Sequence, residues 1–175
     1  MDIFLEYLLD KKNTAADMLK KIGVVLAAVV VMILVMNILA LFGSALIAYV
    51  PIALAAVVYG AYLLIRNFNI EYEYIFTNGE LDIDVIKSRR VRKRLTSLNT
   101  KNIELMARRE NDVYKRDFEN EAIAKKYDAI YDPAKGDIYC VLYSVDGVRT
   151  LLSFQPPEKL VEAMKKLNPR AVHEE

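Results

Sequence analysis

The sequence predicts an α+β membrane protein in which a transmembrane helical hairpin precedes an antiparallel β domain that ends in an amphipathic helix. Three observations lead to this class. Residues 22–65 contain no charged side chain. Between residues 70 and 154, polar and apolar residues alternate in short runs that are separated by Asn-Gly and Asp-Gly, a pattern typical of β-hairpins. Residues 157–168 then carry apolar side chains at helical spacing.

The uncharged segment is long enough for two membrane spans. As a helix, residues 22–65 would extend roughly 65 Å, about twice the ~30 Å hydrocarbon core of a bilayer. A turn at Phe42-Gly43-Ser44 is expected, because Gly and Ser end helices, and it gives spans at about residues 22–41 and 45–65. A cleaved signal peptide is the alternative, but a second apolar span follows the first at once.

Charges flank the predicted hairpin at its outer ends and are missing from its turn. Arg66 follows the second span. The lysines that precede the first span are Lys11, Lys12, Lys20 and Lys21. The positive-inside rule therefore predicts a multi-pass protein of the cell membrane with both termini in the cytoplasm. Residues 1–21 would be a cytosolic or interfacial segment with an amphipathic piece, and residues 66–175 a cytosolic domain.

Polar and small residues inside the spans are candidates for helix packing. Asn37 is expected to hydrogen-bond to the second span or to another subunit, and Ala56 and Gly60 offer a small-residue face for close contact. Because no charged residue lies in either span, packing is favoured over transport. Association into a homo-oligomer stays open.

The segment after the hairpin predicts about seven strands in a 4+3 order. Four are expected at residues 70–77, 80–87, 90–96 and 103–108, and three at residues 126–131, 138–145 and 148–154. Residues 109–125 have mixed charge and weak periodicity, which indicates a loop with a short helix near residues 118–125 and an open role. Four strands, three strands and a terminal helix is the order of a pleckstrin-homology-like (PH-like) domain.

A resemblance supports this architecture. The two-span hairpin followed by YEYIFTNGELDIDVIKSRRVRKRL, with RTLLSFQPPEKLVEAMKKLNPRAV near the other end, resembles small bacterial membrane proteins that carry a cytosolic PH-like domain after a two-helix hairpin. The resemblance covers residues 22–170 and implies a fold and a topology. It brings no activity or ligand, and PH-like folds serve many functions.

The basic stretch IKSRRVRKRL, residues 86–95, is the candidate binding surface. Its cations are Lys87, Arg89, Arg90, Arg92, Lys93 and Arg94. In a strand, alternate arginines from Arg90 onward share one face, and the acids Glu80, Asp82 and Asp84 share a face of the preceding strand. Cross-strand charge pairing is one interpretation. The other is that the turn residues Lys87, Arg89 and Arg90 project beyond the acids and bind anionic lipid or an acidic protein.

Other function classes have little support in the composition. A net charge of +1 and a pI of about 7.7 argue against nucleic acid as a partner. One Cys, one His and the lack of a Gly-rich phosphate loop predict no enzyme, no cofactor and no metal site. Cys140 is expected to be a buried thiol in a reducing cytosol. The tyrosines expected in the core are Tyr72, Tyr74, Tyr139 and Tyr143.

The sequence thus predicts a non-enzymatic, membrane-anchored interaction module that presents a surface to a protein partner or to anionic lipid at the cytoplasmic face. The alternative is a structural or accessory subunit of a larger membrane complex. A small transporter component or an unrecognised enzyme is less favoured.

Overall fold

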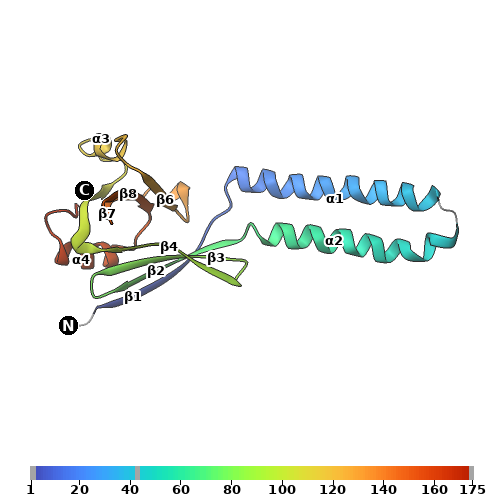
Figure 1. The fold of residues 1–175 in the computed structure, drawn as a ribbon, viewed down its shortest axis with the longest axis horizontal. Coiled ribbons are helices and arrows are strands. Elements are labelled where there is room, and N and C mark those ends of the chain that lie inside the picture. Colours follow the sequence, from blue (N-terminus) through green and yellow to red (C-terminus); the bar gives the residue numbers. More distant parts are fainter. Residues whose placement is uncertain (1–2, 42–43, 174–175) are drawn as a thin grey trace. The chain divides into compact units, whose positions relative to one another are not determined.

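The computed structural model describes residues 3–41 and 44–173, and the chain divides into two compact units (Figure 1). Asn13–Asn69 form a helical unit. The chain up to Lys12 and the chain from Ile70 onward together form a β-rich unit. The helical unit is therefore inserted between the first and second strands of the other.

The helical unit consists of α1 (Ala15–Leu41), the 3₁₀ helix η1 (Ser44–Tyr49) and α2 (Val50–Arg66). Ala15–Leu41 and Ile47–Arg66 are each long and apolar enough to cross a membrane. Thr14 caps α1, since its hydroxyl accepts a hydrogen bond from the backbone N–H of Asp17 at 3.2 Å. The predicted turn at Phe42 and Gly43 lies outside the described residues.

The predicted packing residues do not lie together between the two helices. The half-buried stripe of α1 includes Val24, Ala28, Met32 and Val35. Asn37 is exposed on another face, and its amide donates to the Ile33 carbonyl at 2.8 Å instead of to α2. Ala56 is exposed, and a side chain built at the half-buried Gly60 would meet no atom within 4 Å. Contacts between α1 and α2 therefore leave Asn37 and Ala56 uncovered.

The first sheet is an antiparallel meander in the order β1-β2-β3-β4. Its strands are β1 (Phe4–Asp10), β2 (Ile70–Thr77), β3 (Glu80–Lys87) and β4 (Val91–Asn99). The expected separate N-terminal segment is wrong, because residues 4–10 form β1. Five of its seven residues are apolar, which hides the period of two, yet Leu5, Tyr7 and Leu9 pack against the core while their neighbours are exposed.

The second sheet has the order β5-β7-β8-β6, in which β6 runs parallel to β8. Its strands are β5 (Ile103–Arg108), β6 (Lys125–Ala129), β7 (Tyr139–Val145) and β8 (Val148–Phe154). The α+β class is confirmed, but the strands divide 4+4, because β1 joins the first sheet and β5 pairs with β7. The 3₁₀ helices η2 (Thr100–Asn102) and η3 (Pro133–Lys135) lie in the connections.

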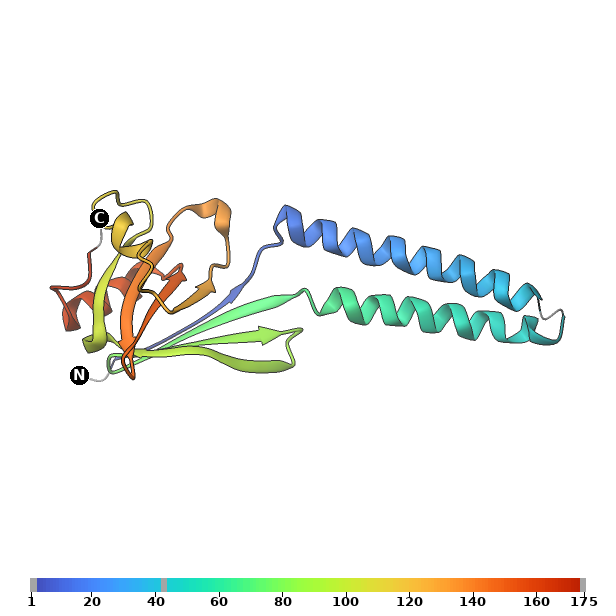
Figure 2. The ribbon, with the colours of Figure 1, turned by 45° about the horizontal axis from the view of Figure 1, so that its top comes forward.

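Short and long helices complete the β-rich unit. The helix α3 (Lys115–Phe118) ends where the short helix was expected to begin. The predicted C-terminal amphipathic helix is α4 (Glu158–Leu167), which begins one residue after Pro157 and buries Leu160, Val161 and Met164. Views from two directions show the paired ends of β3 and β4 extending beyond the second sheet (Figure 1, Figure 2). That hairpin end therefore projects from the packed body of the unit.

The core lies between the two sheets and α4. The four tyrosines predicted to be core residues are all buried. Tyr74 donates from its hydroxyl to the Ala129 carbonyl at 2.6 Å, and the hydroxyls of Tyr143 and Thr96 lie 2.5 Å apart. The buried hydroxyls of Tyr74 and Tyr143 thus each have a hydrogen-bond partner, as buried polar groups usually do. Burial raises the pKa of Tyr74.

Candidate functional site

The basic stretch forms the end of β3, a tight turn and the start of β4. The Arg90 N–H donates to the Lys87 carbonyl at 3.0 Å, so the turn closes over Ser88 and Arg89. Both have positive φ, 55° and 57°. The other two hairpin turns place Asn-Gly and Asp-Gly at the corresponding positions, which tolerate positive φ well. A Ser and an Arg there cost roughly 1–2 kcal/mol each, so this turn is strained where its counterparts are not.

Three of the arginines pair with acids of the same sheet. Arg89 Nε lies 2.7 Å from Glu71 Oε1, which contradicts the expectation that Arg89 projects beyond the acids. Its hydrogen bond to Glu71 and the Glu71 charge raise the pKa of Arg89. Arg92 Nε lies 2.6 Å from Asp84 Oδ2, and Arg94 Nη1 lies 2.5 Å from Asp82 Oδ1. Cross-strand charge pairing therefore accounts for these three cations.

The acids of this network differ in part from those expected. Glu71 and Glu73 of β2 take part, whereas Glu80 lies opposite Asn99. A β-bulge shifts the register between Ile83 and Asp84 and places Asp84 opposite Arg94. Glu71, Glu73 and Asp84 are buried, so the guanidinium groups stabilise carboxylates that would be costly to bury alone. Sequence spacing cannot reveal a bulge. The partners on β2 were missed because Arg89 and Arg92 reach past β3 to acids on a strand that is not adjacent to β4.

The remaining three cations of the stretch are Lys87, Arg90 and Lys93. All three are exposed. Within residues 3–41 and 44–173, none of their side chains forms an ion pair or a hydrogen bond. Lys87 and Arg90 flank the strained turn, and Lys93 lies opposite Val85. These are the groups of the predicted surface that keep their full charge available for a ligand.

The strand register fixes which end of the first sheet carries the turn. Ile70 is the first residue of β2 and pairs with Lys87, the last residue of β3. Ile70 is also four residues beyond Arg66, the end of α2. Four steps of 3.8 Å bound the separation of Arg66 and Ile70 to about 15 Å, and a strand pair adds about 5 Å. The covalent chain alone therefore keeps Lys87 within roughly 20 Å of the end of α2.

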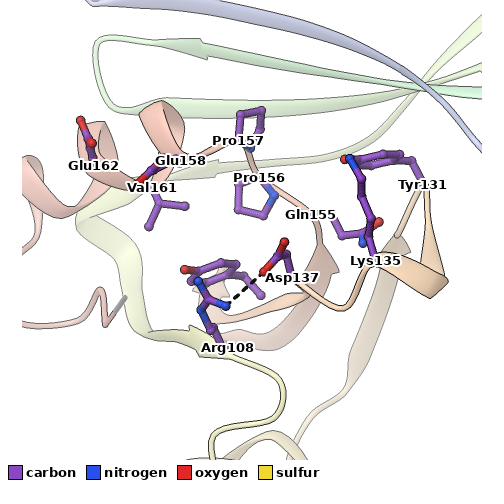
Figure 3. A pocket seen from close by; sticks show the side chains of 11 residues that line it. Arg108, Tyr131, Lys135, Asp137, Gln155, Pro156, Pro157, Glu158, Val161 and Glu162 are labelled. Atoms are coloured by element: carbon purple, nitrogen blue, oxygen red, sulfur yellow. Dashed lines mark hydrogen bonds and ion pairs between the residues drawn. The ribbon is translucent and has the colours of Figure 1, made fainter. Parts of the chain in front are cut away.

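Apart from the basic turn, a cavity lies at the start of α4 (Figure 3). It is a cavity of about 460 Å³, lined by residues from β5, β7, α4 and the segment after β6. Arg108 Nη1 lies 3.1 Å from Asp137 Oδ1, and its guanidinium carbon lies 5.6 Å from the centre of the Tyr139 ring. Lys135 stands over the Tyr131 ring at 6.0 Å. No sequence pattern indicates this cavity, because its walls come from distant segments.

Residues with nucleophilic or metal-binding chemistry are dispersed. Cys140 is buried, as predicted, and its Sγ lies 3.7 Å from Ser153 Oγ. Burial raises the pKa of this thiol, which lowers its reactivity. His173 stacks on Tyr114 with ring centres 4.8 Å apart. In the part of the chain that the structure describes, no group of three His, Cys, Asp or Glu side chains is arranged to hold a metal ion.

Comparison with known families places this architecture. Residues 1–174 match the family described as bacterial PH-like domain (DUF6106). No curated protein and no solved structure matches the chain. The match spans both the apolar helices and the two sheets with their C-terminal helix, so the fold class and the resemblance predicted from the sequence are confirmed. This chain belongs to the bacterial PH-like domain family.

Proposed function

We propose that the chain is a membrane-anchored, non-enzymatic interaction module whose β3–β4 turn binds anionic lipid headgroups at the cytoplasmic face of the cell membrane. The family supports an interaction module in general. The observation that carries the lipid proposal is the pairing of Ile70 with Lys87, which puts the turn at the end of the sheet where the chain from α2 enters. Lipid is favoured over a protein partner because of this proximity.

The path of the chain supports the proximity. From Arg66 the chain enters β2, runs to Asn78-Gly79, and returns along β3 to Lys87. Because β2 and β3 are antiparallel, Lys87 lies at the same end of the sheet as Ile70. The opposite turn lies one strand length farther, about 26 Å for eight residues at 3.3 Å each. The screening length at physiological salt is only about 8 Å, so a cation one strand length farther from the anchor would sense the bilayer much less than Lys87 or Arg90.

The energetics fit a weak, charge-driven contact. A Lys or Arg beside an anionic leaflet contributes roughly 1 kcal/mol. Lys87 and Arg90 together would then contribute about 2 kcal/mol, which corresponds to roughly a 30-fold preference for anionic over zwitterionic lipid. The distribution of lysines and Arg66 around the helices supports the cytoplasmic orientation, where anionic lipid surfaces attract such residues.

Lipid retention by the full-length protein tests this proposal. The full-length protein is needed, because a shortened protein that starts after the helices, at Asn67, lacks β1. Detergent-solubilised protein is equilibrated with an equimolar mixture of phosphatidylglycerol and phosphatidylcholine, and native mass spectrometry measures the ratio of the two bound lipids. We expect Lys87→Gln/Arg90→Gln to lower this ratio by about 30-fold, and added salt to lower it in the unaltered protein.

A matched variant controls for total charge. Lys101→Gln/Lys166→Gln removes the same charge from exposed residues at the other end of the unit, where Asn168 donates to the Thr100 carbonyl at 2.9 Å. We expect this variant to retain the original lipid ratio. Equal ratios in the unaltered protein and the turn variant, or equal losses in both variants, would contradict lipid binding by the turn.

A further inference from the structure

The outer edge of β1 is exposed along Phe4–Asp10, and beyond it the Lys12 N–H donates to the Tyr131 carbonyl at 2.7 Å. Ile3 accepts from the Asn78 N–H and Lys11 donates to the Ile70 carbonyl, both at 2.9 Å. In an antiparallel pair such bonded residues alternate, so the N–H and C=O groups of residues 4, 6, 8 and 10 point away from β2. β1 ends the sheet, so in the described part of the chain no strand pairs with this edge. An edge of this kind can accept an added strand.

The side chains along that edge are apolar and acidic. Phe4 and Leu8 are 61% and 59% exposed, although they lie outside the apolar helices. Glu6 and Asp10 alternate with them and are also exposed. Native edge strands are usually protected by charged side chains, especially lysine, by proline or by a bulge. Phe4–Asp10 contains no lysine, proline or bulge, and its two charges, Glu6 and Asp10, would repel an acidic strand but not a basic one. The composition fits a partner strand that carries positive charge.

Such a strand forms the opposite edge of the same sheet. β4 is the other terminal strand, and its exposed first half contains Arg92, Lys93 and Arg94. Arg92 and Arg94 also contact Asp84 and Asp82 within the sheet, but their side chains are about half exposed, so each guanidinium has further N–H donors to offer to an acid on an adjacent strand. The sheet therefore has an acidic edge and an edge that can donate to acids. A second copy of this chain offers to each edge a strand of the opposite charge, which is the complementarity that fixes register between partners.

Direction and height agree with this pairing. β1 and β3 both run toward the end of the sheet that carries Asp10 and Lys87, and β4 runs in the opposite direction. When the sheets of two copies have the same orientation, β4 of one copy is therefore antiparallel to β1 of the other. Asp10, Glu71, Ile86 and Arg92 form one row across the sheet. Copies anchored at the same height in one bilayer would therefore place Asp10 opposite Arg92 of the next copy, and Leu8 opposite its Arg94.

We propose that the β1 edge of this chain binds the β4 edge of a second copy, which joins the two first sheets into one continuous sheet. The contact is head-to-tail, so each copy retains one free edge and further copies can add until a ring closes. This inference rests on the membrane anchoring in the proposed function, but not on lipid binding by the turn.

Substitution at position 8 tests the backbone part of the contact. The Leu8 N–H points to the free edge, so Leu8→Pro removes a donor from that edge and keeps the bonds between β1 and β2. Leu8→Ala removes the same side chain but keeps the N–H. Fluorescently labelled full-length protein is reconstituted at low density in vesicles of phosphatidylcholine alone, and photobleaching steps count the copies in each cluster.

We expect clusters of two or more copies for the unaltered protein and for Leu8→Ala, and single copies for Leu8→Pro. Single copies of the unaltered protein, or the same cluster size for Leu8→Pro, would overturn the proposal. Because these vesicles contain no anionic lipid, failure of lipid binding by the turn would leave this result unchanged. Circular dichroism confirms that each variant is folded before it is counted.

Disulfide trapping tests the register. Leu8→Cys in one chain and Arg94→Cys in a second, size-tagged chain would lie about 5 Å apart between Cβ atoms, close enough to form a disulfide after modest adjustment. We expect this mixed pair to cross-link, and Asp10→Lys in the first chain to lower the yield about fivefold. Efficient cross-linking between two Leu8→Cys chains, with none in the mixed pair, would overturn head-to-tail pairing.

Discussion

The two ends of the first sheet are built differently. At the Asn78-Gly79 end, the Thr100 N–H and hydroxyl both donate to the Gly79 carbonyl at 2.7 Å, and the turn has residues that tolerate positive φ. At the Lys87 end, a Ser and an Arg have positive φ, and Lys87 and Arg90 are exposed. One end is optimised for packing. The other end retains strain and free charge where the chain leaves the helical unit, and strain of this kind is typical of functional sites.

The strongest test of this contrast separates paired from unpaired charge. Asp84 is 4% exposed and contacts both Arg92 and Arg94. Asp84→Ala would leave two guanidinium groups without that carboxylate. Because both are about half exposed and keep Glu73 and Asp82 as partners, we expect the free energy of unfolding to fall by about 2 kcal/mol. Urea denaturation of the full-length protein in detergent measures this. The matched variant Lys87→Ala should change the value by less than about 0.5 kcal/mol. Comparable losses would show that Lys87 has a structural role.

Substitutions in the two turns should act in opposite directions. Gly79 has φ of 98°, and an added Cβ would lie 3.2 Å from Leu167 Cδ1. Gly79→Ala should therefore lower the free energy of unfolding by about 1–2 kcal/mol. Ser88→Gly should raise it by about 0.5–1 kcal/mol, because Gly adopts positive φ without a steric penalty. Thermal unfolding measures both, and destabilisation by Ser88→Gly would contradict the assignment of strain to this turn.

The smallest effect concerns the lysine that joins β1 to the second half of the unit. Lys12 Nζ lies 2.7 Å from Asp132 Oδ2, and this hydrogen bond lowers the pKa of Asp132 from its usual value of 3.8. The unfolded chain then binds the proton more readily, so the stabilisation is present above about pH 4 and is lost as the pH falls through the lower folded pKa. Lys12→Met should flatten the acid limb of a plot of melting temperature against pH. An unchanged limb would exclude this pair as its cause.

Local patterns predicted the fold where partners are close in the sequence. Asp146-Gly147 located the β7–β8 hairpin, and residues 148–154 are predicted and observed as a strand. β1 was missed because its partner follows the helical hairpin, so no adjacent turn identifies it. The parallel pairing of β6 with β8 and the transfer of β5 to the second sheet also depend on contacts between distant segments.

The candidate site was predictable in composition but not in geometry. A run of cations beside a row of acids predicted charge pairing, and Arg92 and Arg94 form such pairs. The positive φ of Arg89 and its contact with the buried Glu71 were not visible in the sequence, because they depend on the turn conformation. The sequence also does not show at which end of the sheet the turn lies, because that follows from the pairing of Ile70 with Lys87.

The most direct test of the account measures which end of the first sheet lies near the bilayer. Full-length protein that carries a nitroxide label at Arg90→Cys or at Lys101→Cys, in a Cys140→Ala background, is placed in vesicles that contain a nickel-chelating headgroup lipid. We predict strong relaxation enhancement at position 90 and weak enhancement at position 101, which follows Thr100, the residue that donates to the Gly79 carbonyl. Equal enhancement, or stronger enhancement at position 101, would contradict a membrane-facing basic turn.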